Sequence, residues 1–393
     1  MKLFSKHMVF RLLGVFIIII SFNSCIDEYF PDIDKYENLL VIDGAITNQP
    51  GPYEIKLSFS SSVERPKFLP YTGAQVIVED NQGNEEVFTE IEPGIHVSAI
   101  NGLQGIIGRK YKIIIRTPDE SEFQSSFQEL KKPVEIENVY AEIYSRETGD
   151  EYGHEYGYQF YVDTETAENN SAYLMWRVKG AYKYQSEYLI KYIFDNRVLS
   201  IFPHPDSLYT CYHDDNYTGI YTLDMSTLSV PEVNRFPLNY VNTNTRRLSI
   251  RYSLLLKQYT ITEEAYDYYS RIKDVNTQQG SLYTQQPYQI NGNVYSVLDQ
   301  DKAILGYFLV AGIDEKRIFV DRPPSNQVEF YYSICVLNDG DYDAYSYVYW
   351  SPREIWPLYI TTDNNERRAL THQGCVDCRW WGGTIDKPDF WED

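Results

Sequence analysis

The segment Tyr53–Ser60, with the sequence YEIKLSFS, decides the fold class. Its apolar and polar residues alternate without a break, as Tyr53, Ile55, Leu57 and Phe59 against Glu54, Lys56, Ser58 and Ser60. Successive side chains of a β-strand point to opposite faces of the sheet, so a period of two predicts a strand with one buried face. We therefore expect this segment to cover one side of a β-sheet core.

The same kind of strand recurs on both sides of this segment. Turn-forming stretches such as NQPGP at 48–52 and NQG at 81–83 separate the apolar runs, as they do between antiparallel strands. About seven short strands within residues 37–131 meet the needs of a two-sheet sandwich. The further runs are residues 39–46, 74–80, 85–91, 94–100, 110–117 and 122–130.

A second series of strands begins after Pro133. Trp176 lies in the middle of one of them and resembles the core tryptophan of immunoglobulin-like domains. Residues 196–240 are rich in Pro, Asn, Asp and Tyr, and this composition indicates a long loop. We therefore expect a mainly β protein with two β-sandwich domains, immunoglobulin-like or transthyretin-like, at 37–131 and 134–335.

One helix is expected within the second domain, over residues 262–278. It starts at Thr262, and Glu263 and Glu264 lie in its first turn, where carboxylates meet the positive end of the helix dipole. An apolar stripe at spacings of three and four predicts a face that packs on the core. The stripe consists of Ala265, Tyr268, Tyr269 and Ile272.

Residues 336–393 form a Trp-rich, Cys-containing segment that we expect to pack on the second domain. Trp380, Trp381 and Trp391 are the side chains predicted to enter its core. An even number of cysteines in an exported protein favours disulfides. The disulfide candidates can form three different sets of two bridges, and the sequence leaves the choice open. These candidates are Cys211, Cys335, Cys375 and Cys378.

The N-terminal residues 1–24 have the features of an export signal. Three basic residues precede the apolar run LLGVFIIII, which is too short to span a bilayer comfortably. The stretch FNSC at 22–25 resembles the lipobox of a bacterial lipoprotein, in which Cys25 becomes the lipidated first residue. An acidic tether follows at 25–36, and acid directly after the cysteine resembles the surface-export signal of Bacteroidota lipoproteins. We therefore expect a lipid anchor at Cys25, in the outer membrane, with the body exposed on the cell surface.

The composition narrows the classes of partner. With 56 acidic and 35 basic residues the chain has a formal net charge of −21, which repels phosphate backbones, so we expect no nucleic-acid partner. The 43% hydrophobic and 16% aromatic residues favour a folded chain over a disordered one. The 37 tyrosines are best explained as residues at half-buried strand positions. The functional alternative is that their rings stack against sugar rings of a ligand.

Few residues suggest catalysis or metal binding. The chain contains neither G-x-S-x-G nor H-E-x-x-H. Asp339, Asp341 and Asp343 lie around a glycine and offer oxygen ligands for calcium, but the downstream Glu of an EF-hand is missing. An acidic surface turn is therefore the preferred interpretation there, and a solvated loop is preferred for residues 213–215, the sequence HDD. We expect no catalytic residues, no metal and no cofactor.

Several fragments together resemble one family. The chain is similar to the Bacteroidota family catalogued as domain of unknown function 4249, over nearly the whole mature sequence. The resemblance implies a surface lipoprotein, often encoded beside a TonB-dependent, SusC-like outer-membrane transporter, without established catalytic residues. The fragments are residues 39–58, 73–80, 102–115, 263–273, 279–294, 303–320 and the ending CVDCRWWGGTIDKPDFW at 375–391.

The expected function is therefore that of a non-catalytic accessory or ligand-binding subunit of a TonB-dependent transporter. One alternative is a cell-surface hydrolase acting on glycans or peptides, which two close carboxylates, or a His–carboxylate pair with a metal, would favour. Another is a surface adhesin, which a flat, Tyr-rich patch without a pocket would favour.

Overall fold

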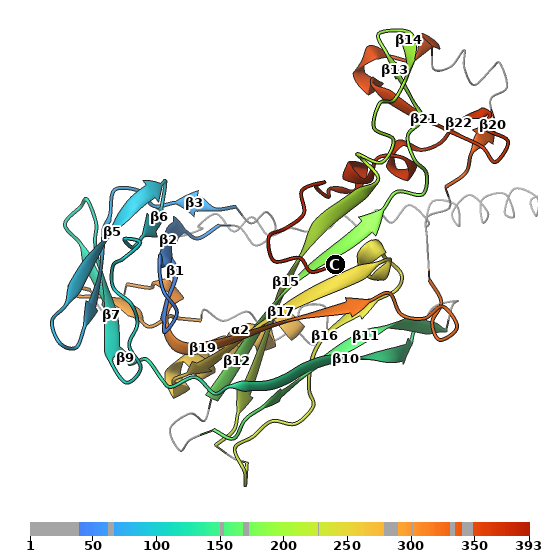
Figure 1. Cartoon of the computed structure of the whole chain (residues 1–393). Helices are drawn as coiled ribbons and strands as arrows, with labels where there is room; N and C mark the ends of the chain where they lie inside the picture. The colour runs from blue at the N-terminus through green and yellow to red at the C-terminus, as the bar shows by residue number, and fades with distance from the viewer. Residues whose placement is uncertain are drawn as a thin grey trace, which may run out of the picture.

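The computed structural model of the chain describes residues 39–61, 67–149, 153–167, 173–226, 228–278, 290–299, 302–330, 335–339 and 349–393. The expected signal, the acidic tether and Cys25 lie outside these ranges. The prediction of a mainly β fold is confirmed, because strands far outnumber helices in the described part of the chain. The chain forms an N-terminal body, a central body and a C-terminal lobe, which lie from left to upper right in Figure 1.

The N-terminal body is a strongly curved antiparallel sheet that encloses its own core. The alternation in the opening segment is confirmed, since Ile55 and Leu57 are fully buried while Glu54 is exposed. Each such apolar side chain contributes roughly 1.5–3 kcal/mol by leaving water. The strands are β1 (Leu40–Thr47), β2 (Glu54–Phe59), β3 (Leu69–Pro70), β4 (Gln75–Asp80), β5 (Glu85–Glu92), β6 (Ile95–Val97), β7 (Lys110–Arg116), β8 (Glu122–Ser125), β9 (Gln128–Glu129) and β18 (Val294–Ser296).

Strand β19 (Leu305–Asp321) joins the first two bodies into one continuous sheet. Its first half pairs in parallel with β1, and its second half pairs antiparallel with β17 of the central body. At the start of the parallel pair, Gly306 has φ +85°, and a Cβ atom there would overlap the carbonyl group of Ile42. Strand β18 likewise pairs with β8, so residues beyond 290 complete the N-terminal body.

The central body is a sandwich of a three-stranded sheet on a four-stranded section of the long sheet. Trp176 is fully buried between the two layers, as predicted, with its ring stacked on Phe236 at 4.5 Å between centroids. Its indole Nε1 donates to Gln258 Oε1 at 2.7 Å. The three-stranded sheet consists of β10 (Ile136–Glu147), β11 (His154–Thr164) and β16 (Phe236–Asn242), and it faces β12 (Tyr173–Gln185), β15 (Thr210–Asp224), β17 (Arg251–Ile261) and β19.

Helix α2 (Glu263–Gln278) covers the opposite face of β12, β15, β17 and β19, and it confirms the predicted helix. The side chain of Thr262 caps its first turn by accepting a hydrogen bond from the Ala265 N–H. Ala265 and Tyr269 are buried against Met175 and Ile261, so the predicted apolar stripe is core packing. Of the described helices, none has the length and apolar character needed to span a bilayer.

The C-terminal lobe has a small sheet of its own. Two of its strands come from residues 192–201. The prediction of a long loop at 196–240 is wrong, because β14, all of β15 and the start of β16 fall within that range. Strand β15 is an edge strand of the long sheet with many exposed polar side chains, which makes its composition loop-like. The lobe comprises β13 (Tyr192–Asp195), β14 (Val198–Ile201), β20 (Asn338–Asp339), β21 (Leu358–Thr362), β22 (Arg368–Leu370) and the 3₁₀ turns η2 (Arg353–Ile355), η3 (Gln373–Cys375) and η4 (Cys378–Trp381); η1 (Arg246–Leu248) belongs to the central body.

Candidate ligand-binding site

Two disulfides hold the C-terminal lobe. Cys211 of β15 is bonded to Cys378 with an S–S distance of 2.01 Å, and Cys335 is bonded to Cys375 at 1.99 Å. One of the three possible sets of bridges is thereby selected, and Cys375 and Cys378 do not pair with each other. The two neighbouring cysteines instead tie the same short segment to two distant parts of the chain.

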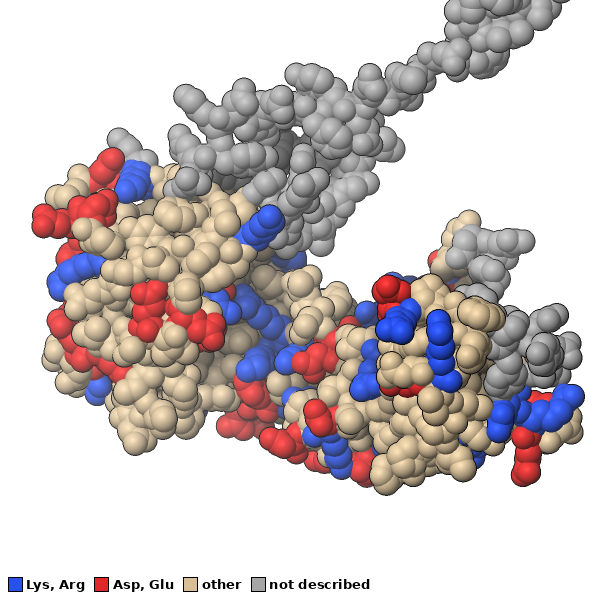
Figure 2. Space-filling view, turned by 90° about the horizontal axis from the view of Figure 1, so that it is seen from above, with Lys and Arg blue, Asp and Glu red and all other residues tan. Residues whose placement is uncertain are grey.

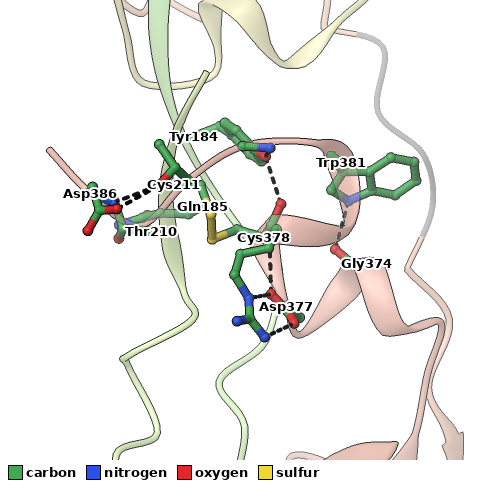
Figure 3. Close-up of a disulfide and its surroundings, with 12 residues drawn as sticks. Tyr184, Gln185, Thr210, Cys211, Gly374, Asp377, Cys378, Trp381 and Asp386 are labelled. Atoms are coloured by element: carbon green, nitrogen blue, oxygen red, sulfur yellow. Dashed lines mark hydrogen bonds and ion pairs between the residues drawn. A yellow bond between two sulfur atoms is a disulfide. The ribbon is translucent and has the colours of Figure 1, made fainter. Parts of the chain in front are cut away.

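The surroundings of the Cys211–Cys378 bridge anchor the segment further (Figure 3). The hydroxyl of the buried Tyr184 donates to the carbonyl of Cys378 at 2.7 Å, and Trp381 Nε1 donates to the carbonyl of Gly374 at 2.8 Å. Burial is the main reason why the pKa of Tyr184 is raised to about 12, so this hydroxyl remains a donor at neutral pH. The segment 374–381 is therefore fixed by covalent and hydrogen bonds on both sides.

The three predicted tryptophans differ in their surroundings. Trp391 is 4% exposed and packs between Tyr212 and Phe319, so it enters the core of the central body as predicted. Trp381 is half-buried. Trp380 is 59% exposed, so the prediction that it enters the core is wrong. The reason is geometric, because η4 turns consecutive side chains in different directions.

The exposed Trp380 lies at a cavity of about 800 Å³ in the C-terminal lobe. Two further aromatic side chains line this cavity: Trp356, which directly follows η2, and Tyr359, which lies in β21. Trp356 packs edge-on against Phe194 and donates its Nε1 to Ser351 Oγ at 2.7 Å, so its ring is held from behind. A concave surface of this size with aromatic walls has the dimensions of a small-molecule site.

Polar groups lie among these aromatic walls. Gln373 is held by two hydrogen bonds to the backbone of Tyr359, and Asp377 is bound by Arg379 through two contacts at 3.0 and 2.8 Å. The hydrogen bonding that the Arg379 guanidinium donates to the Asp377 carboxylate is the main cause that raises the pKa of Arg379. The buried Thr371 Oγ1 has no hydrogen-bond partner among the described residues. The cavity thus combines flat apolar faces with fixed donors and acceptors.

The predicted cation sites do not assemble. Asp339 ends β20, while Asp341 and Asp343 lie outside the described residues. His213, Asp214 and Asp215, expected in a loop, lie in β15, where Asp214 pairs with Lys179 and Asp215 pairs with Arg247. Within the described ranges, no group of three or more His, Cys, Asp or Glu side chains is arranged to hold a metal ion.

A strip of basic side chains crosses one face of the central sheet, between α2 and Trp391. We call Arg177, Lys179, Lys257 and Arg317 the basic strip. Arg177 lies directly opposite Lys257, a like-charge pair that costs stability, although Glu315 approaches Lys257 at 2.7 Å. In the view of Figure 2, Lys and Arg side chains gather in the hollow between the left and right parts of the molecule. Such a gathering is unusual in a chain of net charge −21.

Neither the aromatic cavity nor the basic strip has a direct signal in the sequence. The cavity joins segments around residues 338, 354–359 and 370–380, which are separate in the chain. The basic strip spans three strands from 177 to 317, and only the strand register brings its members together. The one usable signal was the concentration of tryptophan near the chain end.

These features define a mainly β, disulfide-bonded protein with an aromatic cavity in a C-terminal lobe. Over residues 26–317 the chain matches the family described as "Domain of unknown function (DUF4249)", and it belongs to that family. The match ends before the C-terminal lobe strands β20 to β22 begin.

No curated protein is significantly similar to the chain in sequence. Among solved structures, one similarity is to a chain titled "Biofilm associated protein - BSP domain", at 6% identity and a TM-score of 0.12. It covers 71% of this chain and 58% of that chain. At this TM-score the similarity carries no argument about fold or function.

Proposed function

We propose that this protein is a non-catalytic lipoprotein of the outer-membrane surface that binds a ligand for, or otherwise assists, a TonB-dependent transporter. The observation that carries the ligand-binding part is the cavity at Trp356, Tyr359 and Trp380. A cavity favours a ligand-binding protein over an adhesin, for which a flat surface without a pocket was expected. A site tethered above a transporter would raise the local concentration of its ligand.

The chain's N-terminal sequence supports the lipid anchor. The apolar run ends at FNSC, and the family match begins at residue 26, directly after Cys25. Acylation of Cys25 with several chains would give stable membrane attachment, at about 0.8 kcal/mol per buried methylene.

The hydrogen bonds of two cavity residues, His372 and Asp377, favour a binding role over a catalytic one for these side chains. His372 uses its Nδ1 to accept a hydrogen bond from the Gly374 N–H, and both carboxylate oxygens of Asp377 are bound by Arg379. A general acid or base needs a group that is able to reach a substrate proton. These two groups instead fix the shape of the cavity wall.

The basic strip supports a protein partner. It carries four cations on one sheet face, with Lys179 paired to Asp214 and Lys257 to Glu315, so two positive charges exceed the acids paired with them. This excess is complementary to an acidic surface. An acidic loop of the transporter is the partner that we propose for it.

The test is affinity purification of the tagged, full-length protein from native membranes in mild detergent. We expect a TonB-dependent β-barrel to be recovered with it, and Lys179→Glu to reduce that recovery, whereas Lys67→Glu, an exposed control in the N-terminal body, should not. Repeated recovery of the protein alone would overturn the partnership. Equal recovery with both variants would overturn only the role of the basic strip.

A further inference from the structure

A second cavity, of about 560 Å³, lies where the central body meets the C-terminal lobe. Its walls come from the end of β12, the segment between η1 and β17, the residue after β19 and the disulfide-bonded segments of the lobe. It shares no lining residue with the aromatic cavity. It is therefore a separate site, formed by parts of the chain that lie far apart in sequence.

Two arginines dominate the charge of this cavity. Arg246 and Arg322 line it, and Glu187 is the acidic residue among its lining residues. The Arg246 guanidinium stacks on Trp381, with Cζ 3.9 Å from the ring centroid, and Arg322 Nη1 donates to the carbonyl of Ser249 at 3.1 Å. Both guanidinium groups are thus held in place, which preserves their geometry for a ligand.

Burial makes the Arg246 cation a stronger recognition group. Removal from water is the main cause that lowers the pKa of Arg246 below its ordinary value, while the nearby Tyr184, Tyr182 and Glu187 act in the opposite direction. An arginine remains protonated in proteins at neutral pH. A partly desolvated cation attracts an anion more strongly than a fully hydrated one does.

A buried hydroxyl points to a ligand independently of the charges. Ser186 lines the cavity and is 5% exposed, yet its Oγ has no hydrogen-bond partner among the described residues. Its backbone is fixed, because the Ser186 N–H donates to the carbonyl of Tyr209 at 2.9 Å. Buried polar groups nearly always have a hydrogen-bond partner. We therefore expect the Ser186 hydroxyl to donate a hydrogen bond to an acceptor atom of a ligand.

We propose that this cavity binds a small organic anion that carries a carboxylate or phosphate group. The planar guanidinium groups match the oxygen geometry of such groups, and the Ser186 hydroxyl supplies a third donor. The volume of about 560 Å³ admits a small metabolite rather than a lone ion. The site does not depend on the proposed transporter partnership or on the aromatic cavity.

The Cys335–Cys375 bridge is part of this site. Cys335 lines the cavity, and Gly374, another lining residue, precedes Cys375. Opening this bridge removes the covalent link between two of the walls. Reduction is therefore expected to weaken anion binding.

The test is isothermal titration calorimetry of the purified full-length protein in detergent with succinate, glycerol phosphate and neutral glycerol. We expect at least one of the two anions to bind at millimolar concentration or below, more weakly at higher salt, and glycerol not to bind. Arg246→Gln and Arg322→Gln should each weaken binding at least about tenfold, while Arg116→Gln, an exposed control with the same loss of charge, should leave it unchanged.

Ser186→Ala separates a ligand role from a structural one. Because the hydroxyl has no partner among the described residues, its removal should leave the unfolding temperature unchanged while weakening anion binding several-fold. Failure of both anions to bind the wild-type protein would overturn the proposal. Unchanged binding in Arg322→Gln would also overturn it. The Arg322 side chain is exposed, so a loss of binding in this variant would not be explained by misfolding.

Discussion

Cys211 in an edge strand of the central body is bonded to Cys378 in the C-terminal lobe, 167 residues further along the chain. The bond attaches the lobe to the sandwich beside two cavities. The second bridge, between Cys335 and Cys375, spans only 40 residues.

Removing the longer bridge is predicted to destabilise the protein more. Chain entropy gives a cross-link over the longer loop about 1 kcal/mol more stabilisation, within a total of roughly 2–5 kcal/mol per bridge. We therefore expect Cys211→Ser/Cys378→Ser to unfold at lower denaturant concentration than Cys335→Ser/Cys375→Ser. Equal midpoints for the two double variants would contradict this ranking.

The two tryptophans of opposite exposure give a matched pair. Trp391→Ala should lower the free energy of unfolding by about 3–5 kcal/mol, because it empties the space between Tyr212 and Phe319. Trp380→Ala, the same substitution at a 59% exposed site, should change it by no more than about 0.5 kcal/mol. Chemical denaturation of both variants checks the difference, and similar losses would disprove the assigned packing.

The junction between the first two bodies is tested by a pair of glycines. Gly306 and Gly83 both have φ +85°, but a Cβ at Gly83 meets no atom within 4 Å, whereas at Gly306 it meets the Ile42 carbonyl. Both alanine substitutions carry a backbone penalty of about 1–2 kcal/mol. We expect Gly306→Ala to cost at least about 2 kcal/mol beyond Gly83→Ala, measured as the difference in free energy of unfolding. Equal costs would show that β1 and β19 do not pack as described.

The stability of the N-terminal body is predicted to depend on Asp80. Burial alone would raise the pKa of its carboxyl, but hydrogen bonds from Asn84, Gln82 and Arg109 lower it below the ordinary value of 3.8. A carboxyl with a lowered pKa stabilises the folded state above its unfolded pKa, and this contribution is lost as pH falls through the folded pKa. Asp80→Asn should therefore be less stable than wild type at neutral pH.

The difference between Asp80→Asn and wild type should shrink as pH falls below about 3.8. Urea denaturation at a series of pH values measures it. A difference that stays constant down to low pH would refute the role of the Asp80 charge.

Local patterns in the sequence predicted the elements in which one face is buried. The alternation around Ile55 and Leu57, the core position of Trp176 and the helix after Thr262 all follow from the burial of one face or stripe. Strand β15 was missed because its exposed side chains, as at Asp214 and Asn216, are those typical of loops.

Local sequence patterns did not predict contacts between residues that are distant in the chain. The disulfide pairing, the dual pairing of β19 and the cavity at Trp380 all join residues that are distant in sequence. Periodicity shows which face of a strand is buried, but it does not show which strand lies beside it. The aromatic cavity therefore required the arrangement of the C-terminal lobe.

The lipid anchor is the property on which the proposed location and partner both depend. Intact-mass spectrometry of the protein purified from its native membrane measures it directly. We expect a mature chain that begins at Cys25 and carries acyl chains on that residue. A protein that retains residues 1–24, or that begins at Cys25 without added acyl mass, would contradict the proposal.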